Sequence, residues 1–439
     1  MGINSQDVDD NVTIQDGLGT GNKAGVDSQH RLLVNGEGEA DSGFAGRDAF
    51  QRWRVSNPTT LFDAQSQYNR SLRYYYEKTV TGGALSHNAN ESTVSMTITS
   101  SNGSRAVRQS KQYIRYQPGK SQLILVTFDF GSSTQANTQK MAGYFDDDNG
   151  IFIKNAGGSV SMVRRSKVTG SVVESDIAQA SWNIDAMDGN GPSGITLDIT
   201  KAQIFVADIE WLGVGTIRVG LVINGIVYYV HRFNHANLSS ATYMTTANLP
   251  VRWEIKATAA NSSSDSMKSV CASVQSEGGF SERTGLPFAY GMDTAKSISS
   301  TFEPVLSIRP KATFNSIVNR GQVVQLGFEV FGRSSDLIWR VNFDCSLTGA
   351  SFSSVDDDSI IEYDESATSC TNGVIIAKGY VGVGGTGSSS SVSFTKSLLS
   401  KIPISLDIDG ANPTNITIEV RTRTGNADCL VAYNWVELY

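Results

Sequence analysis

The chain has 439 residues, and at roughly 150 residues per domain this length predicts two domains, because all-β domains run longer than average. The net charge is −7, from 36 Lys and Arg against 43 Asp and Glu. Neutralising phosphates requires a basic surface, so we expect no nucleic-acid partner. Only 18% of the residues are charged and 42 are Gly, which disfavours long exposed helices, while 39% hydrophobic residues suffice to fill sizeable cores.

The start of the chain has no basic segment followed by an apolar one, so it predicts no secretory signal peptide, and we expect synthesis in a cytoplasm. The most apolar region, residues 202–230, contains Asp208, Glu210 and Arg218 and is not expected to insert into a membrane. The cysteines are too few and too irregularly spaced for a disulfide framework or a zinc site, and we expect buried free thiols. They are Cys271, Cys345, Cys370 and Cys429.

Residues 1–50 are polar and rich in Gly and Asp, with one short apolar patch formed by Leu32, Leu33 and Val34. Such a composition cannot bury enough surface to fold alone. We expect an extended arm with one small hairpin, which becomes ordered against a partner and attaches through the apolar patch. The alternative is a floppy tail.

Residues 51–270 show the alternation of strands. Val94, Met96 and Ile98 are expected to share one face, and residues 122–130 form a β-rich run. Two hairpins are predicted, one with its turn at residues 155–158 and one with Asn224 and Gly225 between two apolar runs. The segment therefore predicts a large, jelly-roll-like antiparallel β-sandwich.

Residues 271–300 lose this alternation, and we expect a linker whose aromatic residues dock onto one domain. Strand patterns resume in residues 301–439, including residues 403–409, and predict a smaller C-terminal β-sandwich. The Gly- and Ser-rich residues 382–391 have the composition of a mobile loop. The fold class expected is all-β, with two antiparallel β-sandwiches after an extended N-terminal arm.

No motif in the sequence predicts a cofactor, a metal site or a catalytic site. The turn from Asp146 to Asp148 and the pair Asp185 and Asp188 offer oxygens to calcium, but they suit solvated turns better. A glycosidase would need two facing carboxylates, which spacing in the sequence cannot show. His231 and His235 lack the surroundings of a metalloprotease site and are expected to be hydrogen-bonded near a strand end.

Aromatic residues are the more informative feature of the first sandwich. Consecutive tyrosines on a strand point to opposite faces, so at least one of Tyr74, Tyr75 and Tyr76 must lie outside the core. Aromatic side chains with polar tips suit both sugar stacking and protein interfaces. These three tyrosines, with Trp182 and Trp211, are therefore our candidates for glycan or interface contacts.

Four stretches resemble a β-rich structural protein of tailed bacteriophages over about residues 50–260. They are RYQPGKSQLILVTFDFG, YFDDDNGIFI, the segment from DGNGPSGITLDIT to VYYVHRFNHANL, and NLPVRWEI. Residues 21–34, GNKAGVDSQHRLLV, are similar to arms by which phage tail and fibre-type proteins attach to the particle. The resemblance implies a virion component and brings no catalytic residues.

Three functions follow from these observations. The first is a non-enzymatic virion structural protein on the tail, baseplate or capsid exterior, anchored by residues 1–50 to other virion proteins. Such a protein is expected to be a homo-oligomer, and a trimer by analogy with fibre-type proteins. The second is a carbohydrate-binding adhesin that recognises a host surface glycan. The third is a glycan-degrading enzyme that uses carboxylates from residues 146–148 or 185–188.

Overall fold

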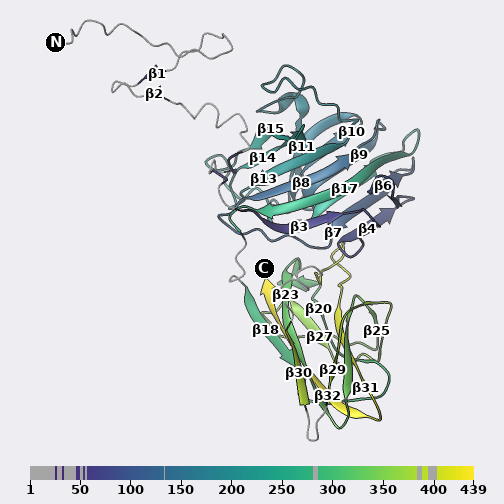
Figure 1. Ribbon diagram of the computed structural model, residues 1–439. Coiled ribbons are helices and arrows are strands. Elements are labelled where there is room, and N and C mark those ends of the chain that lie inside the picture. Colours follow the sequence, from purple (N-terminus) through teal and green to yellow (C-terminus); the bar gives the residue numbers. More distant parts are fainter. Residues whose placement is uncertain are drawn as a thin grey trace, which may run out of the picture.

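The computed structural model describes residues 46–49, 53–54, 57–132, 134–279, 285–382 and 403–439, together with the backbone of residues 25–26, 32–33 and 388–393. Within these ranges the chain is almost entirely antiparallel β-sheet, with one short 3-10 helix, η1 (Gln179–Ser181). The all-β fold class is therefore confirmed. Figure 1 shows two β-sandwiches, with the second lying at the end of the first that carries β3, β4 and β7.

The first sandwich packs a seven-stranded sheet, in the order β12-β11-β10-β9-β16-β7-β4, against an eight-stranded sheet in the described part of the chain. The strands of the seven-stranded sheet are β4 (Tyr75–Val80), β7 (Arg105–Ser110), β9 (Thr138–Phe145), β10 (Gly150–Ala156), β11 (Ser159–Ser166), β12 (Val173–Ala178) and β16 (Val251–Ala257). The eight-stranded sheet runs β15-β14-β13-β8-β17-β6-β5, and β3 pairs with β17. Its strands are β3 (Thr59–Gln65), β5 (Ala84–Asn88), β6 (Thr93–Ile98), β8 (Gln122–Asp129), β13 (Gln203–Ile209), β14 (Ile217–Ile223), β15 (Ile226–Phe233) and β17 (Asp265–Ser276).

Alternating residues of both sheets form the first core. Val94, Met96 and Ile98 on β6 are all fully buried, as the sequence predicts. Trp253 on β16 and Phe128 on β8 belong to the same apolar cluster, although their strands lie in opposite sheets. Each such side chain contributes about 1.5–3 kcal/mol through burial, so the interface between the sheets stabilises the whole sandwich.

Both predicted hairpins are confirmed. In the first, β10 pairs with β11 up to Ala156 and Ser159. In the second, β14 pairs with β15 up to Ile223 and Ile226, and the two turn residues Asn224 and Gly225 have φ values of 52° and 79°. A two-residue turn with both φ values positive matches the right-handed twist of the flanking strands, which is why Asn-Gly is favoured there.

The second sandwich consists of a five-stranded and a six-stranded sheet within the described residues. The five-stranded sheet contains β18 (Leu286–Gly291), β19 (Lys296–Ile298), β23 (Gln322–Arg333), β30 (Ser388–Ser393) and β32 (Ala427–Leu438). The six-stranded sheet contains β20 (Glu303–Pro310), β24 (Leu337–Phe343), β26 (Ser353–Ser354), β27 (Ile361–Asp364), β29 (Val374–Val381) and β31 (Ile416–Thr422). Short pairs are formed by β21 (Thr313–Phe314) with β22 (Ile317–Val318), and by β25 (Ser346–Thr348) with β28 (Ser369–Thr371). Figure 1 places the C-terminus at the end of this sandwich that faces the first.

The expected linker is wrong in its bounds. Residues 271–276 continue β17, and residues 286–291 and 296–298 form β18 and β19, which both pair with β32. Their partner strand lies about 140 residues further along the chain, so the local pattern of the segment could not reveal the pairing. Phe288 and Tyr290 do pack against the second core, in line with the expected docking of aromatic residues.

Two further expectations in the second sandwich are wrong. Ser388–Ser391 belong to β30 and pair with β23, because backbone hydrogen bonds need no apolar side chain, whereas residues 383–387 lie outside the described residues. Residues 403–409 do not form a regular strand and contribute only the isolated bridge between Leu406 and Pro413.

The arm is described only in part. The expected small hairpin is present as the antiparallel pair β1 (Gly25–Val26) and β2 (Leu32–Leu33), while Val34 lies outside the described residues. No helix in the described part of the chain combines the length and the apolar character needed to cross a bilayer.

Candidate functional site

The loop between β3 and β4 exposes large apolar and aromatic side chains of the first sandwich. Tyr68, Leu72 and Tyr74 are 84%, 47% and 38% exposed. The loop curls back on itself, and residues 65 and 67–74 line an open cleft of about 760 Å³. Large apolar surfaces at a hollow are typical of binding sites, whereas single exposed residues need no explanation.

Hydrogen bonds within the loop fix this shape. The side chain of Asn69 accepts from the backbone N–H of Ser71 at 2.6 Å, and the Ser71 hydroxyl donates to the Gln65 carbonyl at 2.8 Å. Ser71 also accepts the backbone N–H of Tyr74 at 2.9 Å and has φ of 51°, in the left-handed region. Non-glycine residues adopt this conformation at a cost, so the cleft is formed by a loop held in a defined geometry.

A second hollow of about 520 Å³ adjoins the cleft and shares Arg70 and Leu72 with it. It is lined also by Tyr76 and Lys111 of the first sandwich and by Asp344 of the second. The Lys111 ammonium lies 4.6 Å from the centre of the Tyr76 ring and 3.8 Å from an Asp344 carboxylate oxygen. Burial raises the pKa of Tyr76 to about 12, so its hydroxyl stays protonated and can donate a hydrogen bond.

Residues 403–409 connect this hollow to the second sandwich. The Tyr76 hydroxyl donates to the Ser405 carbonyl at 3.3 Å, and Lys78 on β4 pairs with Asp409. Nearby, the Gln322 side chain donates to the Tyr113 carbonyl at 2.5 Å. The two sandwiches are thus joined by polar contacts beside the exposed loop.

A buried ionic network fixes the root of the N-terminal arm to the outer face of the eight-stranded sheet. Arg54 donates to Asp208 on β13 and to Glu277 after β17, both at 2.7 Å. Arg218 on β14 lies opposite Asp208 in the sheet and pairs with the same carboxylate oxygen at 2.6 Å. Its guanidinium also donates to the Arg47 carbonyl. Arg54, Asp208, Arg218 and Glu277 are called the arm anchor below.

Charge and burial compete in the arm anchor. Burial raises the pKa of Glu277, the charge of Asp208 raises it further, and Arg54 only partly offsets the increase. Burial alone would lower the pKa of Arg54, but the negative charges around it leave its pKa raised above the usual value. The guanidinium therefore stays charged, and the fully buried Asp208 is neutralised from two sides.

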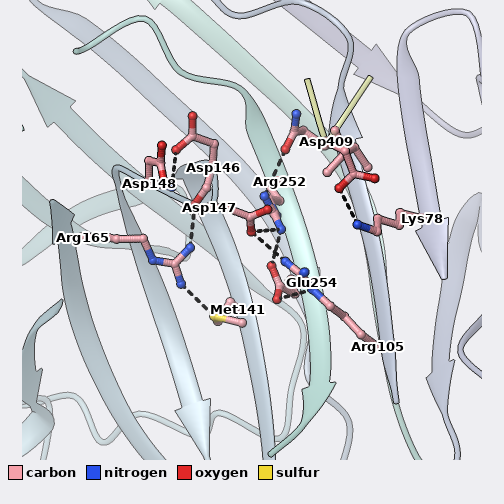
Figure 2. A network of polar contacts seen from close by, with 12 residues as sticks. Lys78, Arg105, Met141, Asp146, Asp147, Asp148, Arg165, Arg252, Glu254 and Asp409 are labelled. Atoms are coloured by element: carbon pink, nitrogen blue, oxygen red, sulfur yellow. Dashed lines mark hydrogen bonds and ion pairs between the residues drawn. The ribbon is translucent and has the colours of Figure 1, made fainter. Parts of the chain in front are cut away.

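A second ionic network covers the outer face of the seven-stranded sheet (Figure 2). Arg252 and Glu254 alternate on β16 with core residues such as Trp253, so their side chains point away from the core. Asp147, in the β9–β10 turn, accepts from Arg105 at 2.7 Å and from Arg252 at 2.8 Å. Burial alone would raise the pKa values of Asp147 and Glu254, but the two arginines lower both, that of Glu254 to about 2.

Guanidinium groups also close over the aromatic side chains of this face. Met141, Phe145, Phe152 and Val163 form a small buried cluster apart from the main core. The guanidinium carbon of Arg165 lies 4.8 Å from the centre of the Phe152 ring, and the guanidinium of Arg252 lies 5.3 Å from that of Phe145. The apolar patch is therefore covered by the protein's own cations and is closed to a ligand.

The acidic turns organise backbone and do not converge. One carboxylate oxygen of Asp146 accepts the backbone N–H groups of Asp148 and Asn149 at 2.8 and 2.7 Å. Asp185 accepts the N–H groups of Met187 and Ser193, both at 2.8 Å. No group of three or more His, Cys, Asp or Glu side chains among the described residues is arranged to hold a metal ion.

Both histidines near the end of β15 are hydrogen-bonded, as predicted. The Nδ1 atom of His231 accepts the backbone N–H of Asn183 at 3.2 Å. The Nδ1–H group of His235 donates to the Gly215 carbonyl at 2.7 Å, and its ring stacks on Tyr243 at 3.9 Å between centres. Burial lowers the pKa of each to about 4, so both are neutral at physiological pH.

The five predicted contact residues lie in different environments. Tyr74 is exposed at the cleft, Tyr76 is half-buried in the adjoining hollow, and Tyr75 is a core residue that packs edge-on against Trp253. Trp182 is buried and donates to the Ile177 carbonyl at 3.1 Å, while the half-buried Trp211 packs edge-on against Tyr116. The structure thus brings Tyr74 and Tyr76 together at one surface and leaves the tryptophans elsewhere.

The expectation of free thiols is wrong for two of the four cysteines. Cys345 and Cys370 form a disulfide across 25 residues of sequence, while Cys271 and Cys429 are free. The strands β25 and β28 pair Leu347 with Cys370, which brings the two cysteines within reach. Two cysteines that meet only through strand pairing show no recognisable spacing in the sequence.

Sequence reasoning missed Tyr68 and the arm anchor. For the arm anchor a signal existed, because Asp208 and Arg218 interrupt two otherwise apolar strands at outward positions. A charge at such a position predicts a partner on the outer face. The identity of that partner, Arg54, could not be read from sequence spacing.

Comparison with protein-family models finds no match, and comparison with curated proteins finds no relative. Several solved structures are similar to part of this chain. A protein of unknown function from Shewanella oneidensis MR-1 is 8% identical, with a TM-score of 0.34 over 56% of this chain and 95% of that chain. A legume lectin-like domain from Entamoeba histolytica is 10% identical, with a TM-score of 0.30 over 50% of this chain and 98% of that chain.

A carbohydrate esterase from the Shiga toxin-encoding bacteriophage phi24B is 9% identical, with a TM-score of 0.30 over 50% of this chain and 99% of that chain. Identities and TM-scores this low carry no argument about function. The β-sandwich architecture rests on the strands of the protein itself.

Proposed function

We propose that this protein is a non-enzymatic structural component of a tailed-phage virion. In this proposal it is an oligomeric β-sandwich protein on the tail, baseplate or capsid exterior, held to other virion proteins by its N-terminal arm. The arm anchor carries the proposal, because an arm that joins a rigid domain to a particle needs a fixed base. Arg54 provides such a base by pairing with two acidic residues of the first sandwich.

The contacts of the acidic residues support a non-enzymatic role. A glycan-cleaving enzyme needs two carboxyl groups facing one bond, one of them protonated. In this protein Asp147 is held by two arginines, and Asp146 and Asp185 each accept two backbone N–H groups. These contacts stabilise turns. Burial raises the pKa of Asp146, but the same carboxyl group accepts the backbone N–H groups of its own turn.

The test is incorporation into particles. Deleting residues 1–45 retains Arg47 and Arg54, so we expect the variant to fold with an unchanged unfolding temperature. Quantitative mass spectrometry of purified particles should show the full-length chain at a fixed ratio to the major capsid protein and should not detect the variant. A folded variant incorporated at the full-length level would refute arm-mediated attachment, and absence of the full-length chain would refute the virion role.

A second candidate function, a carbohydrate-binding adhesin, is favoured by the exposed Tyr68 and Tyr74 at the cleft. Tyrosine offers a flat apolar face together with a polar tip, as sugars require. A ligand of the native state raises the unfolding temperature. The adhesin role therefore predicts a higher unfolding temperature with at least one host polysaccharide, and no shift with any of them would refute it.

A further inference from the structure

The β3–β4 loop is positively charged in a negatively charged protein. Residues 65–74 contain two arginines and no acidic residue, whereas the whole chain carries a net charge of −7. Arg70 pairs with Glu77 at 3.0 Å, which fixes it beside the adjoining hollow. Arg73 is exposed at the cleft and has no partner among the described residues. The cleft therefore offers an unpaired guanidinium beside two exposed tyrosines.

Each of these groups matches one part of an acidic sugar. The tyrosine rings offer flat apolar faces to a sugar ring, and a guanidinium binds a carboxylate through two parallel hydrogen bonds. The cleft is lined by no acidic residue, whereas Glu77 and Asp344 line the adjoining hollow, so the cleft is the part that suits a carboxylate. The hydrogen bonds of Asn69 and Ser71 hold the loop in shape before binding, which reduces the entropy lost on association.

We propose that the cleft of the β3–β4 loop binds a carboxylated polysaccharide, with Tyr68 and Tyr74 contacting sugar rings and Arg73 pairing with a carboxylate. The inference rests on the carbohydrate-binding function and names its ligand class and its site. The polymer is a polyuronic or polysialic chain. Its carboxylates are expected at the cleft and not in the adjoining hollow, because Glu77 and Asp344 line that hollow and Lys111 is already paired with Asp344.

The experiment is calorimetric titration of the full chain with polygalacturonate, alginate and polysialic acid. Dextran supplies sugar without charge, and poly-L-glutamate supplies carboxylates without sugar. The variants are Arg73→Gln and the double variant Tyr68→Ala/Tyr74→Ala. Their matched controls are Arg423→Gln and Tyr380→Ala, whose side chains are exposed on the second sandwich.

We expect at least one acidic polysaccharide to bind and dextran not to bind. Arg73→Gln should weaken binding by about 10- to 100-fold, the usual effect of losing a charged hydrogen-bond pair. Each tyrosine should contribute about 2- to 10-fold, so the double variant loses up to about 100-fold. Both control variants should bind as the unaltered chain does.

Four results would overturn the inference. If dextran bound as tightly as the acidic polysaccharides, the carboxylate would have no role. If poly-L-glutamate bound equally well to the unaltered chain and to the double tyrosine variant, the cleft would be assigned to an acidic peptide. Polysaccharide binding that survives both variants would place the sugar elsewhere and leave the carbohydrate-binding function standing. If none of the three acidic polymers binds, the proposed site is refuted. The carbohydrate-binding function is then refuted as well only if neutral host polysaccharides also fail to bind.

Discussion

Arg54→Ala tests whether the arm anchor fixes residues 46–49 to the first sandwich. In the protein this guanidinium joins Asp208 and Glu277, and its Nε–H group donates to the Arg47 carbonyl at 3.1 Å. The alanine variant loses all three contacts. It leaves Asp208 paired with Arg218 alone and removes the arginine partner of Glu277.

The size of the effect follows from burial. Breaking a fully buried ion pair costs about 3–5 kcal/mol. The side chains of Arg54 and Glu277 are 15% and 11% exposed, and Arg218 continues to neutralise Asp208, so we expect a loss of about 2 kcal/mol. For a domain of about 200 residues this loss lowers the unfolding temperature by roughly 4–8 °C.

Differential scanning calorimetry of the full chain measures this shift, and hydrogen exchange locates it. We expect faster exchange at residues 46–49 and an earlier transition for the first sandwich, while the transition of the second sandwich stays unchanged. Arg423→Ala is the control, because the exposed Arg423 lies 3.6 Å from Asp336 and such pairs contribute less than about 1 kcal/mol. If the Arg54 variant unfolds like the control and residues 46–49 keep their exchange rates, the arm anchor does not hold the arm.

Three further predictions concern pH and the disulfide. Burial lowers the pKa of His235 to about 4 from the ordinary 6.5, so the unfolded chain binds a proton at this residue at higher pH than the folded chain does. The unfolding temperature should therefore fall as the pH is lowered from 6.5 to about 4, and it should fall less steeply in His235→Gln than in the unaltered chain. The pKa of Glu254 is lowered to about 2, since neighbouring arginines outweigh burial. The stabilisation of the folded protein by this carboxylate is complete above pH 4.5 and should vanish toward pH 2. Calorimetry should find this pH dependence absent in Glu254→Gln. Replacing Cys345 and Cys370 by Ser should lower the free energy of unfolding of the second sandwich alone by about 3–4 kcal/mol in urea denaturation, given the 25-residue separation.

Local patterns predicted strands such as β6 because one of the two faces of the strand is buried and the other is not. On β6, Val94, Met96 and Ile98 show this directly, since every second residue is fully buried. The turn at Asn224 and Gly225 was predictable because few residue pairs accept positive φ at both positions. Such features depend on neighbours in sequence, and a single sequence contains them.

The segment 403–409 shows where local patterns fail. Its alternation is real, because Ile404, Leu406 and Ile408 are buried as a strand pattern requires. Its backbone pairs only briefly with the segment that follows, through Asp407 N–H to the Asn412 carbonyl and Thr414 N–H to the Ser405 carbonyl, both at 2.9 Å. The Arg320 guanidinium donates to the carbonyls of residues 406, 407 and 408. Burial was therefore predicted correctly, whereas the backbone pairing is too short to make a regular strand and a distant arginine binds three of the carbonyls.

The candidate site divides in the same way. Strand alternation predicted that at least one of three consecutive tyrosines lies outside the core. On β4, Tyr75 is buried and Tyr76 is half-buried, whereas the exposed Tyr74 precedes the strand and belongs to the loop. The cleft itself needs the loop geometry set by Asn69 and Ser71, which a sequence pattern does not show. Tyr68 gained its significance only from its place at that cleft.

The two ionic networks explain why binding would fall to a loop. On the seven-stranded sheet, the arginines over Phe145 and Phe152 close the one buried apolar cluster found on that outer face among the described residues. On the eight-stranded sheet, the arm root covers the face around Asp208. Displacing either network would expose uncompensated buried charges at about 3–5 kcal/mol each, so a ligand gains more at surfaces that need no such displacement. The β3–β4 loop is such a surface, because its tyrosines and Arg73 already face solvent.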